Sequence, residues 1–371
     1  MGLDILTYDE WLDLFNLKKI TLNTFINTYK IYTTGNIKTL KYTIKEKNLK
    51  KNDVKILYKF FIENKEKYLK NFYNKSLKLL NNLQIKNIKL VLHNATNSSY
   101  KNLIRNLYYK DILLYTKTEI KNLRPFLEVL FDLFNNKLID YKLITPSSIK
   151  MLHRGLFSNI LSGYYFRASI LNPTVIYTLS KKYLKGSTVF TPTLGWSSYM
   201  YGFLSDNNIK EYVGTDVIKH VCKTTTNLAN KLFPNKYIDI YCSPSEQLYK
   251  NQKFLDKYSN YFDIVFFSPP YFKLEIYRGK LQSTNLYKTY EEWLDKYWKT
   301  TIKLCYKVLK NKGKLVYIIS GYDDKIDMNK DMNDITKKYF KYKTYKGLNN
   351  TNVEFSKHKD TNEIIYFYTK K

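Results

Sequence analysis

Four residues, Ser268-Pro269-Pro270-Tyr271, directly follow a run of apolar residues and have the composition of a site that handles an amino group. Two consecutive prolines cannot donate to a sheet, so this segment predicts a rigid corner at the end of a buried strand. The exocyclic amino nitrogen of a nucleic-acid base is a poor nucleophile, because its lone pair is delocalised into the ring. Two acceptors that hold its hydrogens would direct the lone pair outward.

This chemistry assigns a catalytic role to each of the four residues. The Ser268 hydroxyl and the Pro269 carbonyl would accept the amino hydrogens, and Pro270 would hold the backbone without offering a donor. The Tyr271 ring would stack on a base that is turned out of its helix, which contributes on the order of 1–3 kcal/mol. The structural alternative is a proline-stiffened turn, but this combination of residues after a strand favours the functional interpretation.

Short strand-like runs alternate with helical segments from about residue 149 onward. Helices are expected between strands at residues 187–192, 211–217, 237–244, 262–267, 313–320 and 362–370. This alternation predicts an α/β fold with βαβ units and a Rossmann-like, doubly wound, mostly parallel sheet. Ligands of such sheets bind beyond the carboxyl ends of the strands. The loops that follow these strands are therefore expected along one edge.

Two of these loops have residues that suit a nucleotide-like cofactor. Gly195 follows the first strand, where a glycine lets the backbone approach a ligand. Asp216 closes the second strand 21 residues later, close to the ~20 residues at which an acidic side chain meets ribose hydroxyls. Each has a structural alternative, which is an ordinary strand–helix loop at Gly195 and a helix N-cap at Asp216. Ser245, beside Glu246 after the third strand, also suits a helix cap.

These segments together resemble the motifs of S-adenosyl-L-methionine (SAM)-dependent amino methyltransferases, which form N6-methyladenine or N4-methylcytosine in DNA, and are similar to viral and phage DNA methylases. The resemblance covers about residues 147–320 and rests on SPPY, FTPTLGWSS, YVGTDV, CSPSE and FRASILNPTVIYTL. It implies a class I SAM-dependent methyltransferase fold and direct attack on the methyl group, without a covalent intermediate. It implies that SAM is bound by Arg167, Ser169, Asn172, Pro173, Thr191, Gly195, Trp196, Asp216 and Glu246. Glu275 and Arg278, just beyond the catalytic motif, are expected to hold the substrate.

Two residues of the expected SAM loop depart from the family pattern. Thr191 stands where the family usually has Asp, and Ser197 where it often has a second Gly. Thr191 lacks the charge that would pair with the α-amino group of SAM. Three hypotheses follow: a methyltransferase acting on DNA, one acting on RNA including a cap adenosine, and a catalytically inactive nucleic-acid-binding subunit that supports an active partner.

The charge of the chain favours a nucleic-acid partner. Its 371 residues include 62 Lys and Arg against 32 Asp and Glu, which gives a formal net charge of +30. A surplus of this size favours a polyanion, with DNA expected more than RNA. An AT-rich genome would also enrich Lys, but it does not explain the deficit of acidic residues.

The change in composition and in helix and strand patterns along the sequence predicts two domains. Residues 1–148 are expected to form a mainly helical, basic domain, and residues 149–371 the methyltransferase domain. Thr7 and Glu10 have the spacing of a capping box. Gly195 and Ser268 are only 73 residues apart, which leaves no room for a recognition domain between them. The helices of residues 1–148 therefore suit phosphate contact and base stacking, with a structural or partner-binding domain as the alternative.

The remaining features predict an intracellular protein of the cytoplasm or nucleus of a host. The chain begins without a basic, apolar leader, and no apolar run approaches the ~20 residues that span a bilayer. Cys222, Cys242 and Cys305 are scattered and lack His at metal-ligand spacing, so no metal site is expected.

Overall fold

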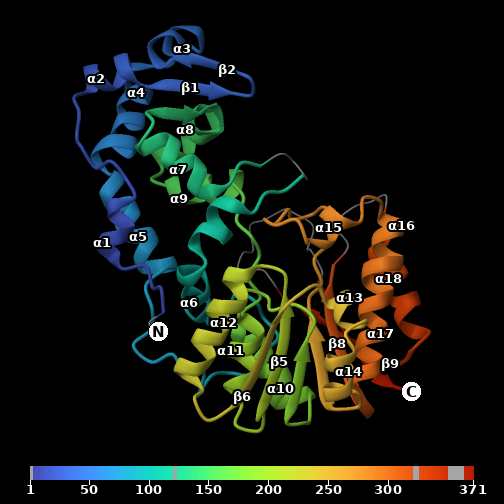
Figure 1. Cartoon of the computed structure of the whole chain (residues 1–371). Helices are drawn as coiled ribbons and strands as arrows, with labels where there is room; N and C mark the ends of the chain where they lie inside the picture. Colours follow the sequence, from blue (N-terminus) through green and yellow to red (C-terminus); the bar gives the residue numbers. More distant parts are fainter. Residues whose placement is uncertain (1–2, 120–122, 321–325, 350–362) are drawn as a thin grey trace. The chain divides into compact units, whose positions relative to one another are not determined.

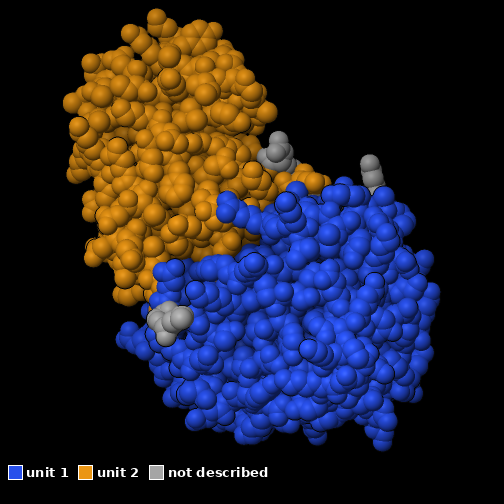
Figure 2. All heavy atoms as spheres, viewed as in Figure 1, with its two compact units in different colours: residues 1–4, 79–107, 170–371 blue, residues 5–78, 108–169 orange. Residues whose placement is uncertain are grey.

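The computed structural model describes residues 3–119, 123–320, 326–349 and 363–371 (Figure 1). The chain divides into two compact units, coloured separately in Figure 2. Unit 1 comprises Met1–Asp4, Leu79–Leu107 and Ile170–Lys371, and unit 2 comprises Ile5–Lys78 and Tyr108–Ser169. This division differs from the predicted boundary at 148/149, because residues 79–107 pack with the C-terminal part of the chain and residues 149–169 with the N-terminal part.

Unit 1 is built on a seven-stranded sheet with the order β6-β5-β4-β7-β8-β10-β9. Strands β4 to β8 are parallel, whereas β10 is antiparallel to both of its neighbours. The strands are β4 (Thr188–Thr191), β5 (Glu211–Asp216), β6 (Tyr237–Cys242), β7 (Phe262–Phe267), β8 (Leu309–Ile319), β9 (Phe340–Leu348) and β10 (Glu363–Lys370). This arrangement confirms the predicted Rossmann-like, mostly parallel sheet. The predicted strand at 362–370 is observed from Glu363, and Asn362 lies outside the described residues.

The helices of unit 1 form two groups. The first contains α6 (Tyr100–Leu107), α10 (Pro173–Tyr183), α11 (Ser198–Leu204) and α12 (Lys219–Leu232), of which α11 and α12 pack on β5. The second contains α13 (Ser245–Leu248), α14 (Gln252–Tyr258), α15 (Ser283–Leu286), α16 (Tyr290–Glu292), a π-helical segment Trp293–Trp298, α17 (Lys299–Val308) and α18 (Met328–Lys337). Within this group, α17 packs on β8 and α18 on β9.

The order of the strands reverses between β4 and β7. The chain runs from β4 outward through β5 to β6, and then returns to place β7 on the other side of β4. The loops that leave β4 and β7 therefore separate at this point, and a crevice of this kind is where open α/β sheets bind ligands. The buried strand β7 (Phe262–Phe267) ends directly before Ser268, as the double proline requires.

Unit 2 is mainly helical, with a small sheet of order β2-β1-β3 that the sequence did not predict. Its strands are β1 (Lys30–Thr33), β2 (Asn36–Thr39) and β3 (Leu138–Asp140). Its helices are α1 (Tyr8–Asp13), α2 (Leu22–Thr28), α3 (Leu40–Glu46), α4 (Lys51–Tyr58), α5 (Lys65–Ser76), α7 (Phe126–Phe134), α8 (Pro146–His153) and α9 (Phe157–Tyr164). Shorter π- or 3₁₀-helical turns lie at Lys59–Glu63, Asp111–Tyr115 and Tyr141–Ile144. The predicted capping box of Thr7 and Glu10 is present at α1.

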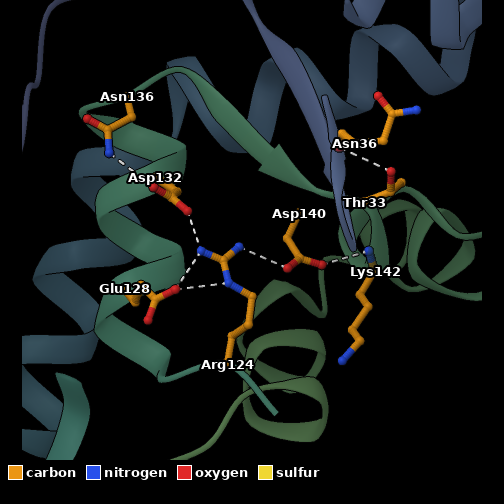
Figure 3. A network of polar contacts seen from close by, with 8 residues as sticks. All are labelled: Thr33, Asn36, Arg124, Glu128, Asp132, Asn136, Asp140 and Lys142. Carbon is orange, nitrogen blue, oxygen red and sulfur yellow. Dashed lines mark hydrogen bonds and ion pairs between the residues drawn. The ribbon is translucent and has the colours of Figure 1, made fainter. Parts of the chain in front are cut away.

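A cluster of charges around Arg124 holds α7 against β3 in unit 2 (Figure 3). The guanidinium donates to Glu128 Oε1 at 2.9 Å and to Asp140 Oδ2 at 3.0 Å, and it also contacts Asp132. The Asp140 side chain is only 2% exposed, and its other oxygen accepts from the N–H of Lys142 at 3.0 Å. One cation therefore compensates three carboxylates, of which one is buried.

Replacing Arg124 with Met is expected to destabilise unit 2 by about 3–5 kcal/mol, because it leaves the buried Asp140 carboxylate without its cation. The measurement is hydrogen exchange of the slowest amides of α7, which reports the free energy of opening of this unit. Arg154→Met, at an exposed arginine that follows α8, is the control. Equal protection in the two variants would show that the cluster contributes nothing.

Candidate functional site

A pocket lies at the carboxyl edge of the unit 1 sheet, where the sequence predicted a site. Three residues of the predicted site line it: Asp216 after β5, Glu246 in α13 and Pro270 after β7. Ten further residues complete the lining: Pro192, Thr193, Val217, Ser243, Pro244, Ser245, Leu281, Gln282, Ser283 and Tyr297. None of these thirteen residues is a lysine or an arginine, although the chain has a net charge of +30.

The two carboxylates of the pocket are largely withdrawn from solvent. Asp216 accepts from the N–H of Ile218 at 3.1 Å and from the N–H of Leu194 at 3.3 Å, which ties the loop after β4 to the end of β5. Burial raises the pKa of the Asp216 carboxyl above its ordinary value of 3.8, against the opposing effect of these N–H donors. Burial likewise raises the pKa of the Glu246 carboxyl, which accepts from the Tyr287 hydroxyl at 3.2 Å. The pocket is therefore an acidic site.

The loop after β4 adopts an unusual backbone conformation. Gly195, Trp196 and Ser197 have φ angles of +50°, +57° and +66°, three left-handed residues in succession. Residues other than glycine adopt this conformation at a cost in free energy. Here the Ser197 hydroxyl is hydrogen-bonded to the Thr225 hydroxyl, with 2.6 Å between the two oxygens. The Trp196 ring meets the ring of Tyr277 edge to face at 5.8 Å. Gly195 and Trp196 thus shape the loop beside the pocket, but neither lines it.

Thr191 does not reach the pocket. It is fully buried, and its hydroxyl lies 2.5 Å from the hydroxyl of Tyr212. The next two residues, Pro192 and Thr193, line the pocket instead. The structure therefore does not support the predicted contact of Thr191 with a cofactor, because its side chain points into the packing between β4 and β5.

The Ser268 backbone and side chain are fixed by three elements. Its hydroxyl donates to the carbonyl of Ile318 in β8 at 3.1 Å, and its N–H donates to the hydroxyl of Tyr199 at 3.2 Å. Its carbonyl accepts from the hydroxyls of Thr193 and Tyr199, both at 3.4 Å. Because the Ser268 proton is directed to a backbone carbonyl, this oxygen can act as a hydrogen-bond acceptor.

Tyr271 occupies a different position from the one expected of a stacking ring. It does not line the pocket, and its hydroxyl interacts with Ser320 and Ser268. Burial raises the pKa of this hydroxyl above its ordinary value of 10.0. Stacking of Tyr271 on a base stays a prediction, whereas the observed contacts make it a support for the Ser268 corner.

Glu275 and Arg278 differ in their environments. Glu275 is 8% exposed and accepts a short hydrogen bond from the hydroxyl of Tyr277. The ring of Tyr277 in turn contacts the ring of Trp196. Arg278 is exposed, and its carbonyl accepts from Gln282 Nε2 at 3.0 Å. The segment that carries both residues therefore leads directly into Leu281–Gln282–Ser283 of the pocket wall.

The four upstream residues of the predicted cofactor site are divided between the two units, and their contact with SAM stays a prediction. Arg167 and Ser169 belong to unit 2, where the Arg167 guanidinium donates to Ser162 at 2.9 Å and lies over the Phe126 ring. Asn172 and Pro173 begin α10 in unit 1. The fully buried Asn172 side chain caps the helix at Thr174 and donates to the carbonyls of Asn94 and Thr96. These contacts give Asn172 a structural role.

Tyr199 is the residue of this region that the sequence analysis missed. It lies four residues after Gly195 as the second residue of α11, and its ring lies under the loop. A Cβ atom added to Gly195 would meet this ring at 2.3 Å, while the Tyr199 hydroxyl contacts Ser268. The spacing of a glycine and a tyrosine by four residues was the available signal.

No protein-family model and no curated protein sequence matches the chain. Solved structures that are similar to it include the N-methyltransferase NodS from Bradyrhizobium japonicum WM9 (11% identity, TM-score 0.35, 53% of this chain and 93% of that one). A second is a putative rRNA-methylase from Clostridium thermocellum (16% identity, TM-score 0.37, 55% of this chain and 100% of that one). A third is TrmN from Thermus thermophilus (10% identity, TM-score 0.36, 54% of this chain and 49% of that one). At these identities and TM-scores the likeness concerns the fold alone.

The described residues contain neither a candidate membrane span nor a candidate metal site. Within the ranges that the structure describes, no helix is both long and apolar enough to cross a bilayer. In the same ranges, no group of three or more His, Cys, Asp or Glu side chains is placed to hold a metal ion.

Gly195→Ala is expected to destabilise unit 1 by about 1–3 kcal/mol, because the added methyl group displaces the buried Tyr199 ring. Chemical denaturation followed by tryptophan fluorescence measures this loss, since three of the four tryptophans, Trp196, Trp293 and Trp298, lie in unit 1. Gly279→Ala is the control: its φ of +113° is at least as restrictive, but nothing lies within 4 Å of an added Cβ. A loss at Gly195 no larger than that at Gly279 would assign the effect to the backbone and not to the ring.

Proposed function

We propose that the protein is a SAM-dependent methyltransferase that modifies an exocyclic amino group of a base in nucleic acid, with DNA as the first candidate. The observation that carries this proposal is the acidic pocket beside the Ser268 corner. Asp216 and Glu246 are its charged lining residues, and Pro270 belongs to both the pocket and the motif. In a chain of +30, a site of this sign suits a cationic ligand and not the polyanion itself.

The residues of the pocket fit the chemistry of SAM. This cofactor carries a sulfonium cation and an ammonium group, with ribose hydroxyls that can donate to a carboxylate. Asp216 ends the second strand of the parallel sheet, which is the position from which an acidic side chain meets a ribose. When bound, SAM supplies an electrophilic methyl group. Asp216 would hold the ribose hydroxyls, and Glu246 would add a second negative charge to the pocket.

The pocket must widen to receive a ligand of this size. Its volume is ≈ 50 Å³, whereas small-molecule sites typically measure roughly 300–1,000 Å³. Leu281, Gln282 and Ser283 form the wall that follows the Glu275 segment, and Leu281 is 46% exposed. Outward movement of this wall would open the pocket without disturbing the strands.

The Ser268 corner supplies the acceptors that an amino group needs. The Ser268 hydroxyl is oriented by its bond to Ile318, so its oxygen and the Pro269 carbonyl would accept the two amino hydrogens. The prolines contribute no N–H that could compete for these acceptors. The target base would be turned out of its strand to reach the corner. The buried Glu275 would accept from the base or its sugar, and the exposed Arg278 would contact a phosphate.

A second candidate function is a catalytically inactive, nucleic-acid-binding subunit that supports an active partner. The burial of Thr191 against Tyr212 favours it, because the family's acidic side chain at this position has no equivalent in the pocket. Titration calorimetry with SAM separates the two. Tight nucleic-acid binding without any binding of SAM would support the inactive subunit and contradict the enzyme.

Ser268→Ala is expected to lower methyl transfer by about 10²-fold, because it removes one of two acceptors for the amino hydrogens. Ser268→Asn should recover part of the activity, because its side-chain oxygen can accept in place of the hydroxyl. The measurement is transfer of tritium from labelled SAM to duplex DNA, single-stranded DNA and RNA. Ser259→Ala, at a serine outside the site, is the control. Equal transfer by all variants would remove Ser268 from the site, and label in RNA alone would make RNA the substrate.

Binding of SAM is expected to weaken as the pH falls toward the raised pKa values of Asp216 and Glu246. Both groups take up a proton at higher pH than exposed carboxyls do, with ordinary values of 3.8 and 4.5, and a protonated carboxyl no longer attracts a cation. Calorimetric titration from neutral to acidic pH measures the loss of affinity. Asp216→Asn should bind weakly with a flatter profile, whereas Asp295→Asn, at an exposed aspartate of the same unit, should keep the wild-type profile. A profile that is identical in all three proteins would contradict the assignment.

A further inference from the structure

Unit 2 contains a cavity of ≈ 590 Å³ that the proposed reaction does not use. It lies between the loop that joins α3 to α4 and the start of α8. The residues that line it are Lys47, Asn48, Leu49, Lys50, Asp53, Ile144, Pro146, Ile149, Lys150 and His153. Its volume falls within the roughly 300–1,000 Å³ of small-molecule sites.

The rim of this cavity is positively charged. Lys47, Lys50 and Lys150 are exposed, and in the described part of the chain none of them forms an ion pair. Asp53, the one carboxylate of the lining, is already engaged. Its Oδ1 lies 3.0 Å from His153 Nε2, and its Oδ2 accepts from the N–H of Lys50 at 3.1 Å. Three amines are thus left to meet an anion.

The floor of the same cavity is apolar. Ile144 and Ile149 are buried, Leu49 is half-buried, and Pro146 adds a rigid edge. A ligand that fits both parts has an anionic group and a body with an apolar face. A nucleotide has this combination, because its phosphate is charged and its base has two apolar faces.

We propose that this cavity receives one nucleotide of a nucleic-acid strand, with the phosphate between the three lysines and the base or sugar against the apolar floor. The inference rests on the proposed function, because it takes the substrate to be nucleic acid. It also adds a binding site to unit 2, separate from the pocket that would hold the cofactor and from the corner that would hold the target amino group.

The surface on both sides of the cavity favours a strand over a free nucleotide. Exposed lysines continue along the two helices that the cavity loop connects: Lys41 and Lys45 on α3, and Lys51 and Lys55 on α4. The ring of Tyr42 on α3 is 54% exposed. A mononucleotide would occupy the cavity alone, whereas the flanking phosphates of a strand would also meet these lysines.

The role of the three rim lysines in binding a phosphate is tested with a triple variant, Lys47→Gln, Lys50→Gln and Lys150→Gln. Binding of a fluorescent single-stranded oligonucleotide of mixed sequence is followed by anisotropy at several salt concentrations, without SAM. Affinity at low salt should fall at least tenfold, and the slope of log K against log salt should decrease by ~0.7, since the cavity would hold one phosphate and each lost phosphate contact removes ~0.7. The matched control replaces three exposed lysines of α5, Lys67, Lys70 and Lys75, by Gln. Equal losses in both triple variants would overturn the proposal.

The cavity itself is tested without any change of charge. Leu49→Trp narrows it beside the apolar floor and should weaken oligonucleotide binding, whereas Leu49→Ala keeps it open and should have a smaller effect. Circular dichroism verifies that both variants are folded. Unchanged affinity of folded Leu49→Trp would show that no nucleotide enters the cavity and would overturn the proposal. Adenosine monophosphate that competes at the affinity of the oligonucleotide would overturn the strand in favour of a free nucleotide.

This experiment separates the present inference from the proposed function. Oligonucleotide binding and methyl transfer are measured separately, because the cavity belongs to unit 2 and Ser268 to unit 1. Cavity-dependent binding without methyl transfer would contradict the proposed enzyme alone. Methyl transfer with unchanged binding of the triple lysine variant would contradict the cavity alone.

Discussion

The candidate site depends on the position of one ring, that of Tyr199. This ring lies directly under Gly195, so the loop after β4 can only take its course because residue 195 has no side chain. The hydroxyl of the same ring accepts from the Ser268 N–H and contacts the Ser268 carbonyl, and thereby fixes the first residue of the corner after β7. The two loops leave the sheet at the point where strand order reverses. Tyr199 therefore contacts both loops.

The parts of unit 1 that the sequence predicted well are those with a local signal. Apolar runs that lead into loops with glycine, aspartate or proline predicted β4, β5 and β7. The rule that ligands bind at the carboxyl edge of parallel sheets then predicted that Asp216, Glu246 and Pro270 lie in one site. The edge strand β9 was missed because its sequence, FKYKTYKGL, alternates aromatic residues with lysines only over its first four residues, and the strand is exposed along most of its length. The sheet of unit 2 was missed because β1 and β3 are more than 100 residues apart, and their pairing is a tertiary contact. The same limit applies to residues 79–107, whose packing with unit 1 has no local signature.

The distribution of charge separates the tasks of the two kinds of cavity. A net charge of +30 favours a polyanion as partner, but this attraction alone would not place a base at Ser268. The pocket at the sheet edge has the opposite sign, with Asp216 and Glu246 and no basic lining residue. It therefore disfavours phosphate and suits a cationic ligand. The cavity of unit 2 has three unpaired amines and suits the anion. The charge of each cavity would thus direct a cationic cofactor to the pocket of unit 1 and an anionic substrate to the cavity of unit 2, before any specific hydrogen bond forms.

The two departures from the family's SAM loop are part of the packing of this fold. An aspartate at position 191 would place a carboxylate where the Thr191 hydroxyl now meets Tyr212, next to Gly214, whose added Cβ would lie 2.9 Å from Thr191 Oγ1. A carboxylate buried at this position without a cation would be costly in free energy. At position 197 a glycine would adopt the left-handed conformation more easily, but the serine compensates through its hydrogen bond to Thr225. Thr191 and Ser197 are therefore matched to Tyr212 and Thr225. In the proposed enzyme, the recognition of a cationic cofactor would consequently fall to Asp216 and Glu246, which line the pocket.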